Sequence, residues 1–397
     1  MKKVIKFGII FCLVVVVSPR LGEAEGEFLS QEDKNIGIEV TADKTTVSVN
    51  EKIKLNYNLY TRYDVRYEGF ETEGRFRGFE LDTPPLGSEI PREVAKVNGK
   101  KYVKACVKTM FLSPIYGGDL VVNPGTAKVG IAEESKMRAF FGLGPNQNKR
   151  RAALLDLKPI VIHVNNPTGK SKEEFLNEFS NRHGATTQLP PVKTDKTIVI
   201  ILLDISGSML AEDMQPKNRL TSAKAAIAKF LQANPDKMIG LKCFAKGVVT
   251  VSSVTQPNSE VVKALEGVHS GLIEKDGTSL GDAIFEATKE LGGYAGNKKE
   301  IILLTDGMNN NSLLDPLTAI DFAFKDHIVV HTIALGTKGP VPYPDPKDGN
   351  KKIMMDAGID EQVLAEIAKE TGGKFGVAKS EVELEGLLNE IQKMLTK

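Results

Sequence analysis

The stretch Thr197–Met209, with the sequence TIVIILLDISGSM, decides how the second half of this chain folds. Its unbroken run of β-branched residues and leucines is typical of a strand buried on both faces of a parallel sheet. The run ends at Asp204, and Ser206, Gly207 and Ser208 follow in a tight turn. Open α/β sheets bind ligands at the carboxyl ends of their strands. The stretch therefore predicts a strand that delivers oxygen-bearing side chains to a binding site.

Two other segments place the same kind of side chain at a predicted strand-to-helix junction. Ile301–Thr305 is a second buried strand and is followed by Asp306, while Thr278 lies in a turn ahead of a helix that begins near Leu280. One such segment alone often only caps a helix or closes a turn. Three with matching chemistry favour a shared site, and oxygen donors without His or Cys suit a hard divalent cation. The predicted metal ligands are Asp204, Ser206, Ser208, Thr278 and Asp306. The predicted ion is Mg²⁺, with Mn²⁺ or Ca²⁺ as alternatives.

This pattern resembles the metal-ion-dependent adhesion site (MIDAS) of von Willebrand factor A domains. The D-x-S-x-S motif begins at Asp204, and a later threonine and a T-D-G sequence follow it as they do in that family. The resemblance implies that the two serines and Thr278 bind the ion directly or nearly so, whereas Asp204 and Asp306 act partly through water. An Asp or Glu carboxylate from a protein partner would fill the remaining position.

Length and charge bound the remaining possibilities. The chain has 397 residues, of which 41% are hydrophobic and 26% charged, and its formal net charge is +1. This length allows two or three domains with sizeable cores. The even charge balance gives no sign of a nucleic-acid partner.

The first residues have the form of a secretion signal. Lysines precede an apolar run at Phe7–Val17, and Gly22-Glu23-Ala24 offers a small-x-small cleavage site. We expect a signal peptide at residues 1–24 and an exported protein, with membrane association only through this N-terminal segment. The run is shorter than the roughly 20 apolar residues of a membrane span. Cys106 and Cys243 fall in different predicted domains and are expected to be buried free thiols.

Residues 35–165 read as an all-β domain. Apolar residues recur at every second position, and Asn98-Gly99 between two strand-like runs predicts a two-residue hairpin turn. Several short strands separated by turns predict an immunoglobulin-like β-sandwich. The order of segments resembles the repeats of bacterial aerotolerance (Bat) D proteins. Residues 166–196 are the predicted linker, with a short helix near Lys172–Phe179.

Residues 197–397 alternate between strand and helix patterns, which predicts a doubly wound, Rossmann-like α/β domain of six strands and six helices. The predicted strands include Met238–Phe244, Val248–Val254, Ile328–Leu335 and Lys374–Ala378, and the predicted helices include Thr221–Leu231, Val261–Val268, Leu280–Leu291, Asp360–Thr371 and Glu381–Leu395. Thr337–Gly358 is rich in Pro, Gly and Lys and is expected to be a long loop near the binding end of the sheet.

Several sequences in this domain resemble the Bat A and Bat B proteins, which are von Willebrand A proteins of the same aerotolerance group. Met209–Leu220 is the most specific of them, and HTIALGTKGPVPYP is another. The resemblance implies a periplasmic location or the periplasmic face of the inner membrane, Bat partners and a MoxR-type ATPase. We therefore expect an envelope stress scaffold, with a secreted or surface adhesin as the alternative.

An enzyme is the remaining class to weigh. Metal-dependent hydrolysis needs a general base beside the ion, and the five histidines do not converge in the sequence. His327 and His331 flank a predicted strand, where residues four apart are separated by about 13 Å. The sequence contains no phosphate-binding P-loop. The sequence therefore predicts a binding protein rather than an enzyme.

Overall fold

The computed structural model describes residues 28–84, 90–133, 146–183, 192–194, 196–214, 217–274, 277–295, 298–307, 309–345 and 348–395. They form two compact units. The first holds the described residues up to Asn166 apart from Arg77–Glu80, and the second holds Arg77–Glu80 and the chain from Pro167 onward. The predicted signal peptide lies outside the described residues.

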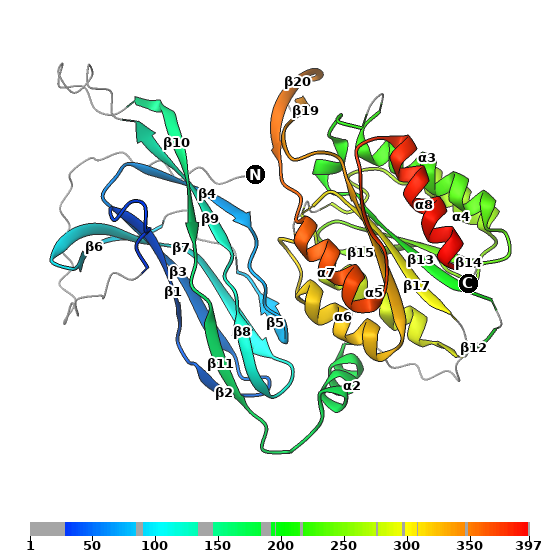
Figure 1. Ribbon diagram of the computed structural model, residues 1–397, viewed down its shortest axis with the longest axis horizontal. Helices are drawn as coiled ribbons and strands as arrows, with labels where there is room; N and C mark the ends of the chain where they lie inside the picture. The colour runs from blue at the N-terminus through cyan, green and yellow to red at the C-terminus, as the bar shows by residue number, and fades with distance from the viewer. Residues whose placement is uncertain are drawn as a thin grey trace. The chain divides into compact units, whose positions relative to one another are not determined.

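The described part of the first unit is built from β-strands (Figure 1). Its sheets have the strand orders β1-β3-β7-β5 with β6 also paired to β7, β10-β9-β4, and β2-β11-β8. The strands are β1 Ile36–Ala42, β2 Thr46–Ser48, β3 Ile53–Thr61, β4 Val65–Thr72, β5 Phe79–Asp82, β6 Arg92–Val97, β7 Lys100–Pro114, β8 Gly118–Val122, β9 Thr126–Glu133, β10 Asn146–Asp156 and β11 Ile160–Asn165. The all-β prediction is confirmed, while the immunoglobulin-like arrangement stays a prediction.

Local sequence rules account for these strands. In β3 the side chains of Ile53, Leu55, Tyr57 and Leu59 are all fully buried, as a half-buried strand with a period of two requires. The predicted hairpin joins β6 to β7, and its two turn residues have φ angles of 48° and 73°. Asparagine followed by glycine suits this turn because both central positions need positive φ.

The second unit is a doubly wound α/β domain, as predicted. Its six-stranded sheet has the order β15-β14-β13-β17-β18-β21, with only the edge strand β15 antiparallel to its neighbour. These strands are β13 Ile198–Asp204, β14 Met238–Phe244, β15 Val248–Ser252, β17 Lys299–Thr305, β18 Ile328–Leu335 and β21 Phe375–Ala378. A short parallel pair, β12 Val192–Lys193 and β16 Tyr294–Ala295, lies outside this sheet.

Helices cover both faces of the sheet (Figure 1). On one face α3 Arg219–Ala233 packs against α4 Asn258–Glu266 and α8 Glu381–Leu395, and on the other α6 Pro316–Lys325 packs between α5 Leu280–Gly292 and α7 Glu361–Thr371. Helix α2 Lys172–Arg182 precedes the sheet in the chain, and a 3₁₀ turn, η1 Gly207–Leu210, follows β13. Alternate residues of the buried strands, such as Val199, Ile201 and Leu203, fill the core beneath α3, α4 and α8.

Most of the predicted elements of this domain are confirmed to within three residues. Cys106 and Cys243 are free, as expected. The prediction that both are buried is confirmed for Cys243 and wrong for Cys106, which is half-buried. Within the described residues, none of the helices is both long and apolar enough to cross a bilayer.

The prediction of a long loop at Thr337–Gly358 is wrong. This segment forms a hairpin of its own, with β19 Gly339–Asp345 paired antiparallel to β20 Asp348–Ala357. Three prolines in β19 made a strand look improbable, because proline cannot donate to a sheet. They lie at alternate positions, and the carbonyl of Pro342 points away from β20 to accept a hydrogen bond from Glu212 N–H at 2.8 Å. The prolines thus occupy the outer side of the edge strand, where no donor is needed.

Candidate metal centre

The candidate centre lies at the carboxyl end of the central strand β13. The chain passes from β13 to β14 on one side, while β17 pairs with β13 on the other. The strand order therefore reverses at β13, and open α/β sheets bind ligands at such a switch point. Asp204 ends β13 and is fully buried there.

The loop after β13 holds its serines in place through buried neighbours. The backbone N–H of Ser206 donates to Asp204 Oδ1 at 2.8 Å, which closes the turn. The next apolar side chain, Met209, is fully buried in the core beneath α3. These contacts fix the loop, and the side chain of Ser208 within it is half-buried.

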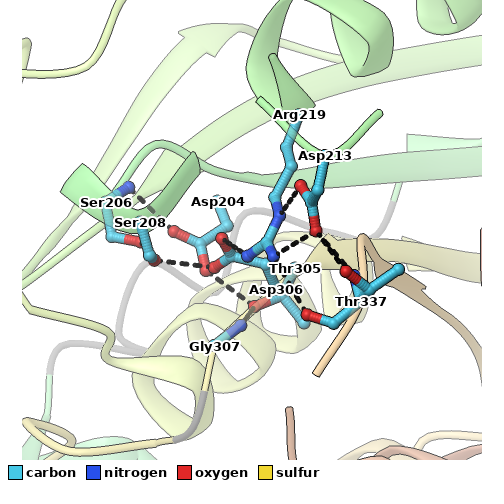
Figure 2. Close-up of polar contacts among 9 residues, drawn as sticks. All are labelled: Asp204, Ser206, Ser208, Asp213, Arg219, Thr305, Asp306, Gly307 and Thr337. Atoms are coloured by element: carbon cyan, nitrogen blue, oxygen red, sulfur yellow. Dashed lines mark hydrogen bonds and ion pairs between the residues drawn. The ribbon is translucent and has the colours of Figure 1, made fainter. Parts of the chain in front are cut away.

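The structure brings the second strand end to these serines (Figure 2). Ser208 Oγ donates to Asp306 Oδ1 at 2.8 Å, and the Oγ atoms of Ser206 and Ser208 lie 3.0 Å apart. Asp306 is 1% exposed and comes directly after β17. Residues separated by about one hundred positions in the sequence therefore share one network.

Thr278 reaches the same place from the turn before α5. A Cβ atom placed on Gly307 would lie 2.9 Å from Thr278 Oγ1 and 3.4 Å from Asp204 Oδ2, so the threonine hydroxyl and the carboxylate border one space. The turn is fastened by the loop after β17, where Asn310 Oδ1 accepts from Thr278 N–H at 2.9 Å and Asn309 Oδ1 from Leu280 N–H at 3.0 Å. All five predicted ligands thus lie around one strand end.

Three further residues belong to this network and were not predicted (Figure 2). Thr305 Oγ1 donates to Asp204 Oδ2 at 2.6 Å. Arg219, fully buried, donates through Nη1 to Asp306 Oδ2 at 2.6 Å and through Nε to Asp213 Oδ1 at 2.7 Å. Arg219 is the first residue of α3, where a cation opposes the helix dipole. The nearby carboxylates of Asp213 and Asp306 offset this unfavourable position.

Burial and mutual repulsion set the proton affinities of these carboxylates. Burial, followed by repulsion from Asp306, raises the pKa of Asp204 to about 7. Burial also raises the pKa of Asp306, against the attraction of Arg219. Burial has the same tendency at Asp213, but hydrogen bonds and the charge of Arg219 outweigh it and hold that pKa below its ordinary value.

The donor set matches the preferences of a hard divalent cation. Both carboxylates are held from the protein side. Ser208 donates its proton to Asp306 and therefore accepts from Ser206, which leaves one lone pair of the Ser208 hydroxyl and both lone pairs of the Ser206 hydroxyl for another partner. Asp204, Asp213 and Asp306, when ionised, carry two more negative charges than Arg219 offsets. Within the described residues, no group of three or more His, Cys, Asp and Glu side chains is arranged to hold a metal ion.

The buried histidine of the sheet has structural contacts. His331, 0% exposed, accepts from Lys374 N–H at its Nδ1 atom at 2.9 Å, which places the ring proton on Nε2, 2.5 Å from Glu300 Oε2. His327 precedes the same strand in a positive-φ conformation. Neither histidine is among the groups that contact Asp204 or Asp306.

Comparison with known proteins assigns the fold around this centre. Residues 199–309, which run from β13 past Asp306, match the family model of the von Willebrand factor type A domain. The chain carries a von Willebrand factor type A domain. The matched residues include all five predicted ligands.

Relatives of this von Willebrand A chain are similar over about half of its length. A UPF0353 protein of Mycolicibacterium paratuberculosis is 28% identical over 214 residues, which are 51% of this chain and 62% of the relative. An uncharacterized protein of Borreliella burgdorferi is 28% identical over 179 residues, or 45% of this chain and 52% of the relative. The chain thus spans between half and two thirds of the length of these relatives.

Two solved structures are also similar. BatB from Bacteroides thetaiotaomicron is 28% identical, and the similarity covers 51% of this chain and all of that one, with a TM-score of 0.44. An aerotolerance-related membrane protein from Bacteroides fragilis is 27% identical over 50% of this chain and 98% of that one, with a TM-score of 0.43. Bat-related proteins and UPF0353 proteins are therefore among those this chain resembles.

Proposed function

We propose that this protein binds protein partners through a divalent cation held at Asp204, Ser206, Ser208, Thr278 and Asp306. The observation that carries the proposal is the meeting of these side chains from three distant segments at one strand end. Mg²⁺ is the first choice, with Mn²⁺ or Ca²⁺ as alternatives, because every donor is a hydroxyl or a carboxylate.

The hydroxyls would be the direct ligands. Each carboxylate already accepts two hydrogen bonds, Asp204 from Ser206 N–H and Thr305, and Asp306 from Ser208 and Arg219. A cation bound mainly by neutral hydroxyls keeps much of its positive charge, and it attracts a further anionic oxygen. An Asp or Glu carboxylate of the partner would supply that oxygen. We propose binding of this acid, without chemistry on it.

The setting we propose is an exported scaffold of a Bat-type aerotolerance or envelope stress complex, in the periplasm or on the periplasmic face of the inner membrane. The signal-like N-terminus, the Bat-type sequence at Met209–Leu220 and the names of the similar proteins support this setting. Bat proteins and a MoxR-type ATPase are the proposed partners.

Calorimetric titration with Mn²⁺ tests the centre directly. Wild-type protein should bind one equivalent, and Ser208→Ala should weaken binding by about tenfold or more, since a lost ligand costs on the order of 1–3 kcal/mol. Ser208 is half-buried and outside any regular strand, so this variant is expected to fold, and circular dichroism would check that. Asp204→Ala should abolish binding. A wild-type chain that takes up no Mn²⁺ or Mg²⁺ at millimolar concentration would refute the proposal.

A pull-down from envelope extracts, with and without chelator, tests the setting. Recovery of Bat proteins and the ATPase only when the cation is present supports the scaffold. Recovery of extracellular matrix protein in their place would overturn it in favour of an adhesin.

A further inference from the structure

A buried network leads from the candidate metal centre to the start of the β19–β20 hairpin (Figure 2). Arg219 contacts Asp306 on one side and Asp213 on the other, where Nη2 lies 2.6 Å from Asp213 Oδ2. The same Asp213 oxygen accepts from the backbone N–H of Thr337 at 2.7 Å and from its hydroxyl at 3.0 Å. Thr337 lies two residues before β19. One guanidinium therefore separates a metal-centre carboxylate from the carboxylate that anchors the hairpin.

The hairpin is fastened to the loop of the centre at further points. Ala211 packs with Val341 and Ala357 in a small apolar cluster separate from the main core. Glu212 donates its N–H to the carbonyl of Pro342 and forms an ion pair with Lys352 on β20. Residues 211–213, which directly follow η1, thus contact both strands of the hairpin and the residue before it.

The backbone at this junction is shaped around the Arg219–Asp213 pair. Gly336, between β18 and Thr337, has a φ of 92°, a conformation that side chains other than glycine rarely adopt. A Cβ atom there would lie 2.2 Å from Arg219 Nε and 2.6 Å from Asp213 Oδ2. The ion pair therefore sits directly against the chain where it leaves the sheet for the hairpin.

A cation bound at the proposed centre would act on this network. Arg219 is fully buried, and a second positive ion near Asp306 competes with the guanidinium for the charge of that carboxylate. Arg219 then relies more on Asp213, its only other carboxylate partner among the described residues. Asp213 in turn holds Thr337. A change in the hydrogen bonds of Arg219 at the centre would in this way reach the residue that precedes β19.

We propose that Arg219 is a positioning residue that couples the cation site to the β19–β20 hairpin through Asp213. The inference rests on the proposed function, and it adds that the hairpin is the element that responds when the ion binds. The hairpin carries two exposed apolar side chains, Ile353 and Met354, which would move with it.

Amide hydrogen exchange of the full chain with and without saturating Mn²⁺ tests the coupling. The amides of β20 are the probes, because the prolines of β19 have no amide hydrogen. In the wild type, Mn²⁺ should change their exchange rates by about threefold or more. In Asp213→Asn the change should fall below about 1.5-fold when the variant is measured at its own saturating Mn²⁺ concentration, fixed beforehand by calorimetry, so that a lower affinity cannot account for the loss.

Two further variants guard against a trivial result. Thr337→Val removes one hydrogen bond to Asp213 and keeps the backbone bond, so its response should lie between wild type and Asp213→Asn. Lys242→Met is the matched control, because it breaks a buried ion pair with Glu290 that contacts none of the residues in the network. It should respond as the wild type does.

The results separate this inference from the proposed function. A wild-type chain that binds Mn²⁺ without any change in β20 exchange overturns the coupling and leaves the metal centre standing. So does a full response in Asp213→Asn. A wild-type chain that binds no Mn²⁺ overturns both.

Discussion

Replacing Gly307 by alanine should close the candidate metal centre and leave the fold intact. A Cβ atom at this position would lie 2.9 Å from Thr278 Oγ1 and 3.2 Å from Thr278 Cγ2. Real Cβ atoms do not approach other atoms within 3.0 Å, so the threonine side chain must move. It is 3% exposed and borders the buried Asp204, which leaves it little room except by turning its hydroxyl away.

The size of the effect follows from losing one hydroxyl from the proposed set of direct ligands. A lost or misplaced hydrogen-bonding partner in a buried site costs on the order of 1.5–3 kcal/mol, which corresponds to a decrease in Mn²⁺ affinity of about ten- to one-hundredfold. The backbone N–H of Gly307, which donates to Thr305 Oγ1 at 3.0 Å, is kept in the variant. Metal-free stability should therefore fall much less than metal affinity.

Calorimetric titration with Mn²⁺ at pH 8 would measure this, alongside thermal unfolding without metal. Gly247→Ala is the matched control: Gly247 follows β14 in the same domain, and a Cβ atom there would meet no atom within 4 Å. If Gly307→Ala binds Mn²⁺ within about twofold of the wild type, the space between Thr278 and Asp204 is not where the ion binds. Equal weakening by Gly247→Ala would show that the steric explanation is wrong.

Three other predictions concern pH, metal and the β-strand unit. Burial raises the pKa of Asp282 to about 6, so the protonated carboxyl stabilises the fold below pH 4 and this stabilisation is lost as the pH rises through 6. The free energy of unfolding in urea should therefore fall by at most about 3 kcal/mol between pH 4 and 7 in the wild type, and Asp282→Asn should remove this pH dependence. Saturating Mg²⁺ should raise the melting temperature more at pH 8 than at pH 6, and chelator should reverse the rise. The reason is that Asp204 is protonated below its pKa of about 7 and must lose that proton before the ion binds. Gly99→Ala should cost on the order of 1 kcal/mol in urea unfolding, because the turn residue has a φ of 73°.

The sequence predicted the sheet domain well because its four central strands, β13, β14, β17 and β18, are buried on both faces. Ile328–Leu335 is buried along almost its whole length and is apolar apart from His331 and Thr332, so its ends coincide with the ends of the apolar pattern. Helix boundaries were less certain. Helix α4 was predicted at Val261–Val268 and spans Asn258–Glu266, since it begins directly after Pro257 and ends at Gly267, whereas the prediction followed its apolar residues alone.

The hairpin and Arg219 could not be predicted in the same way. Prolines at every second position of β19 are compatible with a strand only if their side faces away from the partner strand, and the sequence does not say which side that is. A buried arginine reads as a surface cation until its partners are known, and Asp306 is 87 positions away. Long-range pairs of this kind depend on which strands become neighbours, and local patterns do not carry that information.

The charges of the centre explain why partner recognition would involve more than the ion. Asp204, Asp213 and Asp306 exceed Arg219 by two negative charges when ionised, so a divalent ion makes the buried group neutral as a whole. A partner's carboxylate then gains from its direct bond to the ion and little from any field at longer range. Contacts beside the ion must supply the rest of the affinity and the choice of partner. The β19–β20 hairpin is fastened to the same loop and carries exposed Ile353 and Met354, which makes it the element of this domain best placed to supply them.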